Sequence, residues 1–201
     1  MATPMRLLIV IALSCLLSKP VLGQDFETGV EAHKRGDYAA ALRNWQPLAE
    51  QGHAGAQYQL GVMYEYGRGV PPNDAEAVKW YTEAAGRGVA AAQYKLGIMY
   101  DNGWGVSGSD AEAVKWYRKA AVQGHAYAQY DLGLMFASGA GVPRDYVRAH
   151  MWLNLAIAQG NNHMIKHRNE IAKNMTPAQI ADARRMAREW MQMQQEQSRH
   201  N

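Results

Sequence analysis

Apolar residues recur at intervals of three and four along most of this chain, the spacing that places side chains on one face of an α-helix. Glycine-containing breaks such as Gly67-Arg68-Gly69-Val70 separate successive stretches. Each stretch has its own apolar face. Before this break the face consists of Ala56, Leu60, Met63 and Tyr64, and after it of Ala77, Trp80, Tyr81, Ala84 and Ala85. The pattern predicts pairs of helices joined by glycine loops.

The helix pairs repeat with a period of 36 residues, which separates Gly61, Gly97 and Gly133 as well as Trp80, Trp116 and Trp152. Residues 54–89 and 90–125 agree at 22 of 36 positions, and residues 126–161 form a more diverged third copy. A helix pair cannot bury its apolar face alone, so such copies stack on one another. The predicted fold is an all-α, superhelical solenoid of helix-turn-helix repeats.

Further elements are expected at both ends of the three copies. Residues 24–53 read as a degenerate N-terminal repeat, because Leu42, Ala49 and Gly52 stand 36 before their counterparts in the next copy. Residues 162–191 read as C-terminal capping helices, the last starting with Thr176 as N-cap and Pro177 as the first helical residue. Residues 192–201 form a polar tail that we expect to fray.

Residues 1–23 have the pattern of a signal peptide. Arg6 precedes an apolar run of 11 residues, from Leu7 to Leu17, which is too short to span a bilayer. We expect cleavage after Gly23 and hence a periplasmic or secreted protein, with no membrane insertion afterwards. An uncleaved anchor is the alternative. Lipidation at Cys15 is disfavoured because Ala12 stands where a bulky aliphatic residue is usual.

Composition argues against several functional classes. Cleavage would leave 19 basic and 18 acidic residues, so no excess charge favours nucleic acid. The only cysteine, Cys15, would be removed as well. His163 and His167 have helical ligand spacing, but a metal site needs further ligands. We therefore predict no cofactor, no metal and no catalytic residue, and we assign aspartates near helix starts, such as Asp37, to capping.

Repeat register separates core positions from candidate contact positions. The periodic tryptophans Trp80, Trp116 and Trp152 are predicted to lie in the core, and the mid-helix glycines to allow close contact between helices. Trp104 falls in a glycine loop where the other copies have Arg68 and Ala140, so we treat it as a candidate exposed contact.

A binding surface is sought where the copies disagree, because packing constrains the positions that they share. The candidate partner-binding residues on the first helices are Gln59, Lys95 and Asp131, then Tyr66, Asn102 and Ser138, with Tyr127 on the same helical face. Their mixed polar chemistry favours a protein or peptide partner. The alternative is that they are ordinary solvent-facing side chains.

The motif Ala-x-Ala-x-x-Leu-Gly-x-x-Tyr, followed by Gly-x-Gly-Val and an Ala-x-x-Trp helix, resembles the Sel1-like repeat family, a relative of the tetratricopeptide repeat. Ala54, Leu60, Gly61, Tyr64 and Trp80 carry it in one copy. The resemblance implies a right-handed superhelix whose concave surface binds proteins.

We therefore expect an exported scaffold, and not an enzyme. The first alternative is a cell-envelope enzyme or penicillin-interacting protein, after a cysteine-rich branch of the family whose paired cysteines this chain lacks. The second alternative is a secreted host-interaction effector.

Overall fold

The computed structural model describes residues 22–200, and side chains over residues 26–199. This part of the chain contains ten α-helices, one 3₁₀ turn and no strand, which confirms the all-α prediction. The helices are α1 (Leu22–Lys34), α2 (Tyr38–Glu50), α3 (Ala54–Tyr66), α4 (Asp74–Gly86), α5 (Ala90–Asn102), α6 (Asp110–Val122), α7 (Ala126–Ser138), α8 (Tyr146–Ala158), α9 (Ile165–Ala172) and α10 (Pro177–His200), with η1 at Asn162–Met164. The predicted signal peptide lies almost wholly outside the described residues.

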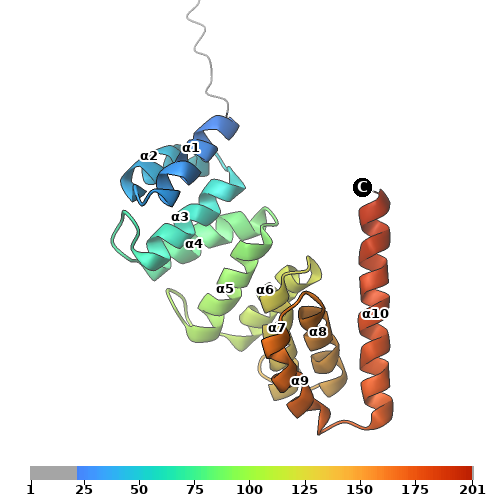
Figure 1. The fold of residues 1–201 in the computed structure, drawn as a ribbon. Coiled ribbons are helices and arrows are strands. Elements are labelled where there is room, and N and C mark those ends of the chain that lie inside the picture. Colours follow the sequence, from blue (N-terminus) through green and yellow to red (C-terminus); the bar gives the residue numbers. More distant parts are fainter. Residues whose placement is uncertain (1–21, 201) are drawn as a thin grey trace, which may run out of the picture.

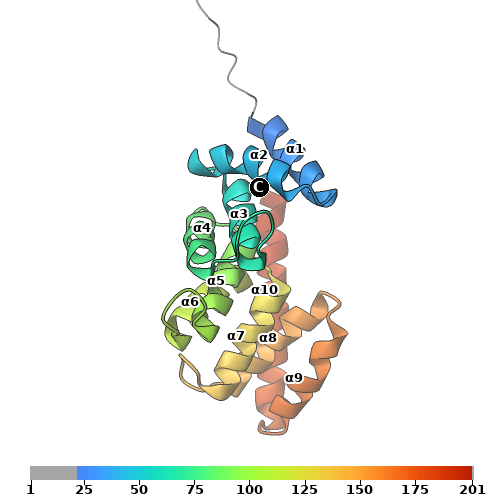
Figure 2. The same ribbon diagram turned by 90° about the vertical axis from the view of Figure 1, so that its left-hand side faces the viewer.

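Helices that follow one another in sequence also pack on one another, from α1 through α9, so the array grows in one direction (Figure 1). Odd-numbered helices are the first helices of the pairs and even-numbered helices the second, and each pair is turned relative to the one before it (Figure 2). None of the described helices is long and apolar enough to span a bilayer.

The glycine loops connect neighbouring repeats as well as the helices of one repeat. Gly103 ends α5 with a φ of 70°, a left-handed conformation in which its N–H bonds the Met99 carbonyl. At Gly105 φ is 69°, and a Cβ atom there would lie 2.4 Å from the carbonyl carbon of Asp74, at the start of α4. Gly141 meets Asp110 in the same way one repeat later. The second glycine of each of these loops therefore lets the loop rest on the preceding repeat.

The two helices of a repeat come close together at the mid-helix glycines, as predicted. The side chains that pack on these glycines in two copies are tyrosines and not the periodic tryptophans. A Cβ at Gly61 would lie 2.5 Å from the Tyr81 ring, and one at Gly97 would lie 2.3 Å from the Tyr117 ring. Tyr81 and Tyr117 are fully buried. Trp152 is buried as predicted, whereas the Trp80 and Trp116 side chains are only partly buried and pack at the edge of the core. The prediction is therefore confirmed for Trp152 and for Tyr81, which shares the predicted face with Trp80, but Trp80 and Trp116 are only partly buried.

Three buried glutamines fasten successive repeats together. Gln93 donates from Nε2 to the Ala85 carbonyl at 3.1 Å, and its Oε1 accepts a hydrogen bond from Gln123 at 2.7 Å. Gln57 and Gln129 make the equivalent pairs of bonds, to Ala49 and Arg87 and to Ala121 and Gln159. Because each buried amide has a partner, these polar side chains are accommodated in the core without an unpaired group.

The C-terminal end closes the array with a long helix. Thr176 and Gln179 form the predicted capping box, in which each side chain bonds the other residue's backbone N–H. Helix α10 packs on α8, burying Ala183 and Ala187, and Trp190 meets Trp152 edge to face at 5.2 Å. The helix continues to His200 through the segment predicted to fray, with residues 191–199 exposed.

Candidate functional site

The candidate residues of the first helices differ in exposure. Tyr66 and Tyr127 are 54% and 50% exposed, large values for aromatic side chains. Lys95 and Asp131, at equivalent positions of α5 and α7, are half-buried, as is Gln59 on α3. Asn102 and Ser138 are exposed near the ends of their helices. We call the surface formed by Gln59, Tyr66, Lys95, Asn102, Tyr127, Asp131 and Ser138 the first-helix face.

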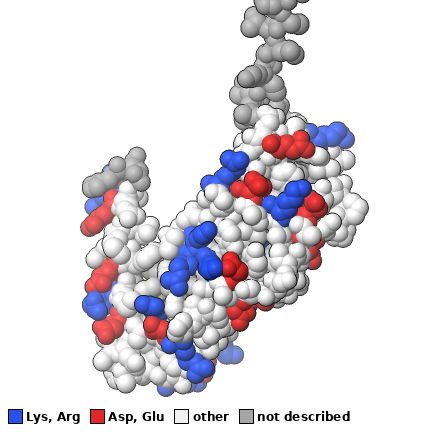
Figure 3. All heavy atoms as spheres, turned by 180° about the vertical axis from the view of Figure 1, so that it is seen from behind, with Lys and Arg blue, Asp and Glu red and all other residues white. Residues whose placement is uncertain are grey.

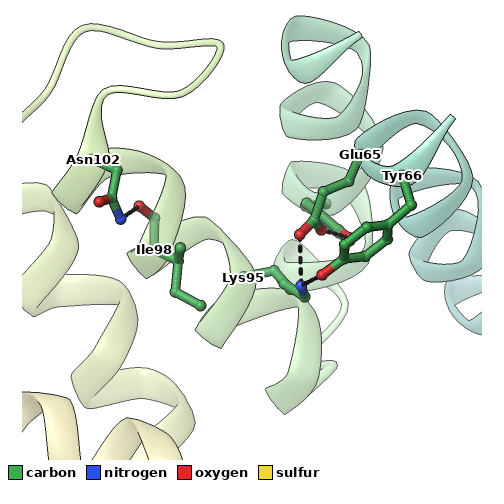
Figure 4. A network of polar contacts seen from close by, with 6 residues as sticks. Glu65, Tyr66, Lys95, Ile98 and Asn102 are labelled. Carbon is green, nitrogen blue, oxygen red and sulfur yellow. Dashed lines mark hydrogen bonds and ion pairs between the residues drawn. The ribbon is translucent and has the colours of Figure 1, made fainter. Parts of the chain in front are cut away.

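Lys95 braces two repeats (Figure 4). Its Nζ donates to Glu65 Oε1 at 2.7 Å and to the Tyr66 hydroxyl at 2.8 Å, both on α3. The Tyr81 hydroxyl donates to the same carboxylate. Burial lowers the pKa of Lys95, but the hydrogen bonds to Glu65 and Tyr66 outweigh it and the net pKa is raised. Lys95 is therefore a charged structural brace.

One repeat later the same two positions are both acidic. Asp101 replaces Glu65, and Asp131 replaces Lys95. The Tyr117 hydroxyl donates to Asp101 Oδ2 at 3.2 Å, just as Tyr81 donates to Glu65. Burial raises the pKa of Asp131 to about 6, a hydrogen bond from Tyr94 opposes this rise, and the Asp101 charge adds to it. Asp131 is thus a partly desolvated carboxylate without a cationic partner among the described residues.

A cavity of about 610 Å³ opens beside these carboxylates, where α7 meets α9. Its floor is apolar, because Leu134, Met135 and Ile171 contribute to the lining. The polar part of the lining comes from four helices and from the turn after α9, and it carries no lysine or arginine; it includes Asp101, Asp131, Ser138, Tyr146, His167, Glu170 and Asn174. The cavity therefore combines an apolar floor with net negative charge.

Aromatic contacts link α5, α7, η1 and α9 in this part of the array. Tyr94 stacks with Tyr127 at a centroid distance of 6.3 Å, and Tyr127 in turn lies 6.5 Å from the His163 ring. The Tyr130 hydroxyl and His167 Nδ1 are hydrogen-bonded at 3.0 Å. Both histidines with ligand spacing thus contact tyrosines. Among the described residues no three His, Cys, Asp or Glu side chains gather as a metal site would require.

Trp104 is 48% exposed in the loop between α5 and α6. Its counterpart Arg68 reaches back to His33, at 3.3 Å, and lies over the Tyr38 and Tyr66 rings. The Trp104 side chain has no hydrogen-bond or ring partner in the described part of the chain. Its exposure agrees with the sequence prediction, and its role as a contact residue stays a prediction.

Two features were missed by sequence reasoning. Tyr146 from α8, and His167 and Glu170 from α9, complete the cavity, although none of them lies on the first helices that were compared, and His167 had been considered only for its spacing from His163. A second cavity, of about 360 Å³, lies between α10 and the ends of α6 and α8, where Trp190, Met191 and Leu155 contribute. Figure 3 shows α10 separated from the body by a hollow, with acidic and basic residues interspersed on this face.

Solved structures similar to this one are themselves repeat solenoids. A Sel1 repeat protein from Oxalobacter formigenes aligns with a TM-score of 0.67 and 38% identity over 69% of this chain and 57% of that one. The protein c5321, a protective antigen of uropathogenic Escherichia coli strains with an SLR fold, aligns with a TM-score of 0.73 and 36% identity, covering 83% of this chain and 38% of that one.

Curated relatives match over shorter segments. The exopolysaccharide production negative regulator of Rhizobium meliloti (strain 1021) is 43% identical over 60 residues, which is 30% of this chain and 22% of that protein. The DAP3-binding cell death enhancer 1 of Rattus norvegicus is 44% identical over 50 residues, covering 25% of this chain and 10% of that protein. The chain thus spans about a fifth or less of the length of these relatives.

The profile of the Sel1 repeat matches residues 22–53, 54–89, 90–125 and 126–161. These segments correspond to the helix pairs α1–α2, α3–α4, α5–α6 and α7–α8. They cover more than half of the sequence, and the chain therefore belongs to the Sel1 repeat family.

Proposed function

We propose that this protein is an exported scaffold that binds a segment of a partner protein on the first-helix face. Sel1 repeat proteins are generally protein-interaction scaffolds. The observation that carries the proposal is the combination of exposed Tyr66 and Tyr127 with the cavity beside Asp131 on the same face. Large aromatic side chains contribute much of the binding energy at protein interfaces.

The repeat comparison supports this choice of face. Positions that pack the helices, such as Gly61 and Gly97, are shared by the copies, while the first-helix face changes from copy to copy. A solenoid keeps its stability through the shared positions, so the variable face is available for recognition. Export is proposed from the N-terminal pattern of Arg6 and the apolar run of residues 7–17.

Affinity capture from the native cell envelope tests the proposal. The bait variant Gln59→Ala/Tyr127→Ser changes the first-helix face without touching the Lys95 brace or the core. Its matched control, Lys79→Ala/Thr82→Ala, changes two exposed positions of α4. A partner held by wild type and by the control but lost with the face variant is expected. Equal capture by all three baits, or capture of nothing, contradicts the proposal.

Two alternatives from the sequence have their own tests. An envelope enzyme or penicillin-interacting protein would hydrolyse or be acylated by a β-lactam above background, although the chain has no Ser-x-x-Lys motif. A secreted host-interaction effector is favoured by the likeness to c5321, a protective antigen. Finding the protein in the culture medium and not in the periplasm on fractionation would support the effector.

A further inference from the structure

The internal repeat provides a comparison within one molecule. Of the ion pairs among the described residues, the Glu65–Lys95 pair is the one that joins two repeats; the others link residues three or four apart in the sequence. The Lys95 and Glu65 side chains are only 18% and 13% exposed. This fold therefore holds an ammonium group between two adjacent first helices, close to a carboxylate and a tyrosine hydroxyl.

At the next junction the carboxylate is kept and the ammonium group is absent. Asp101 still accepts the hydrogen bond from Tyr117, but Asp131 replaces the lysine. Two acidic side chains now line one cavity, and like charges in a partly desolvated place repel each other. Glu170, also in the lining, has Lys173 as its partner at 2.7 Å, whereas Asp101 and Asp131 have no cationic partner in the described residues.

The rest of the lining fits a cation attached to an apolar stem. Leu134, Met135 and Ile171 form a floor suited to methylene groups, and long basic side chains bury such stems against apolar surface. The Tyr146 hydroxyl has no hydrogen-bond partner within the described chain and is available to accept one, as the Tyr66 hydroxyl does from Lys95. A bare metal ion fits less well, because no three His, Cys, Asp or Glu side chains among the described residues come together closely enough to hold one.

We infer that the cavity between α7 and α9 is a receptor for a lysine or arginine side chain of a bound protein segment, with Asp101 and Asp131 as its charge partners. The inference rests on the proposed function, because it assigns a chemistry to one part of the first-helix face. It predicts that the partner presents a basic residue that enters this cavity, in the place that Lys95 takes from within the chain one repeat earlier.

The test is a ¹⁵N–¹H NMR titration of the full chain with small probes: N-acetyl-lysine methylamide, N-acetyl-arginine methylamide and, as the neutral control, the same lysine probe acetylated on Nζ. Both basic probes should cause saturable shifts at residues 101, 131, 134–138 and 146, and the acetylated probe should not. Equal shifts with the acetylated probe, or no saturable shift with either basic probe, would overturn the inference.

Two variants keep the test independent of folding. Asp131→Asn preserves the shape of the side chain and should raise the Kd of the lysine probe about tenfold, the loss expected for one charge-assisted hydrogen bond. Asp131→Lys should supply the cation from within the chain and abolish probe binding while the far-UV circular dichroism stays native. The control Asp182→Asn, on the exposed face of α10, should leave the Kd unchanged. An unchanged Kd for Asp131→Asn contradicts the assignment.

The probe titration and the envelope capture together separate the receptor proposal from the scaffold proposal. Probe binding at the cavity together with failed envelope capture would support the cavity as a site for a basic side chain and contradict the scaffold. Capture that depends on the first-helix face but is unaffected by Asp131→Lys would support the scaffold and overturn the receptor.

Discussion

Replacing Asp131 by asparagine should stabilise the protein at neutral pH. The folded carboxyl has a pKa of about 6 against an ordinary 3.8, because burial and the Asp101 charge disfavour its ionised form. Since each tenfold change in proton affinity is worth about 1.4 kcal/mol, this difference sets an upper limit of about 3 kcal/mol. Part of the side chain meets solvent, so we expect a gain of about 1–2 kcal/mol.

The sign of the pH dependence follows from proton linkage. Between pH 3.8 and about 6 the folded state binds this proton more tightly than the unfolded state, so the contribution of Asp131 to stability falls as the pH rises through this window. Above about pH 6 the Asp131 carboxyl is ionised in both the folded and the unfolded state, and the full cost of burying its charge remains. Asparagine carries no charge, so the advantage of the variant should be largest near pH 7.5 and should disappear near pH 4.

Urea unfolding of wild type, Asp131→Asn and Asp101→Asn across this pH range measures the effect. Asparagine can still accept the hydrogen bond from Tyr94, which limits the change to the charge. The Asp101 variant, at an exposed position, reports the mutual repulsion without the desolvation of Asp131. A variant that is less stable than wild type at pH 7.5, or whose advantage is the same at pH 4 and pH 7.5, would refute the reasoning.

Three further predictions concern the array itself, each checked by chemical denaturation. Tyr117→Ala should cost about 3–5 kcal/mol because it empties a fully buried site against Gly97, whereas Trp116→Ala should cost about 1–2 kcal/mol because that side chain is partly exposed. Gly105→Ala should cost at least about 2 kcal/mol, from positive φ and the clash with α4, while a gain would refute the loop contact. Trp104→Ala should stay within about 0.5 kcal/mol, and a large loss would place it in the core.

Much of the fold is predictable from the sequence because the repeat period, the loop glycines and the caps are local signals. Asn73, Ser109 and Thr176 cap their helices through their own side chains. The choice between Trp116 and Tyr117 for the buried site was not predictable, since neighbouring residues of an apolar stripe are only about 100° apart on a helix. Tyr117 takes the buried site because Gly97 of the neighbouring helix leaves room for its ring, and this match becomes visible only once the two helices are packed.

The candidate site, too, was predictable in part from the sequence, while the rest depends on packing. Differences between the copies identified the face that carries Tyr66, Tyr127 and Asp131. They did not reveal that Lys95 is held by Glu65 while Asp131 has no such partner, because that distinction depends on which side chains meet across two helices. The place of Tyr146 and His167 in this cavity was not predicted, because they enter it from elements outside the aligned first helices.

Site-specific photo-crosslinking in living cells tests the central claim most directly. A photoreactive phenylalanine derivative at position 127 would stand on the first-helix face, and the same residue at position 82 would stand on the exposed side of α4. The account predicts a discrete crosslinked product from position 127 and none from position 82. Crosslinking from position 82 alone, or equally from both positions, would contradict recognition through the first-helix face.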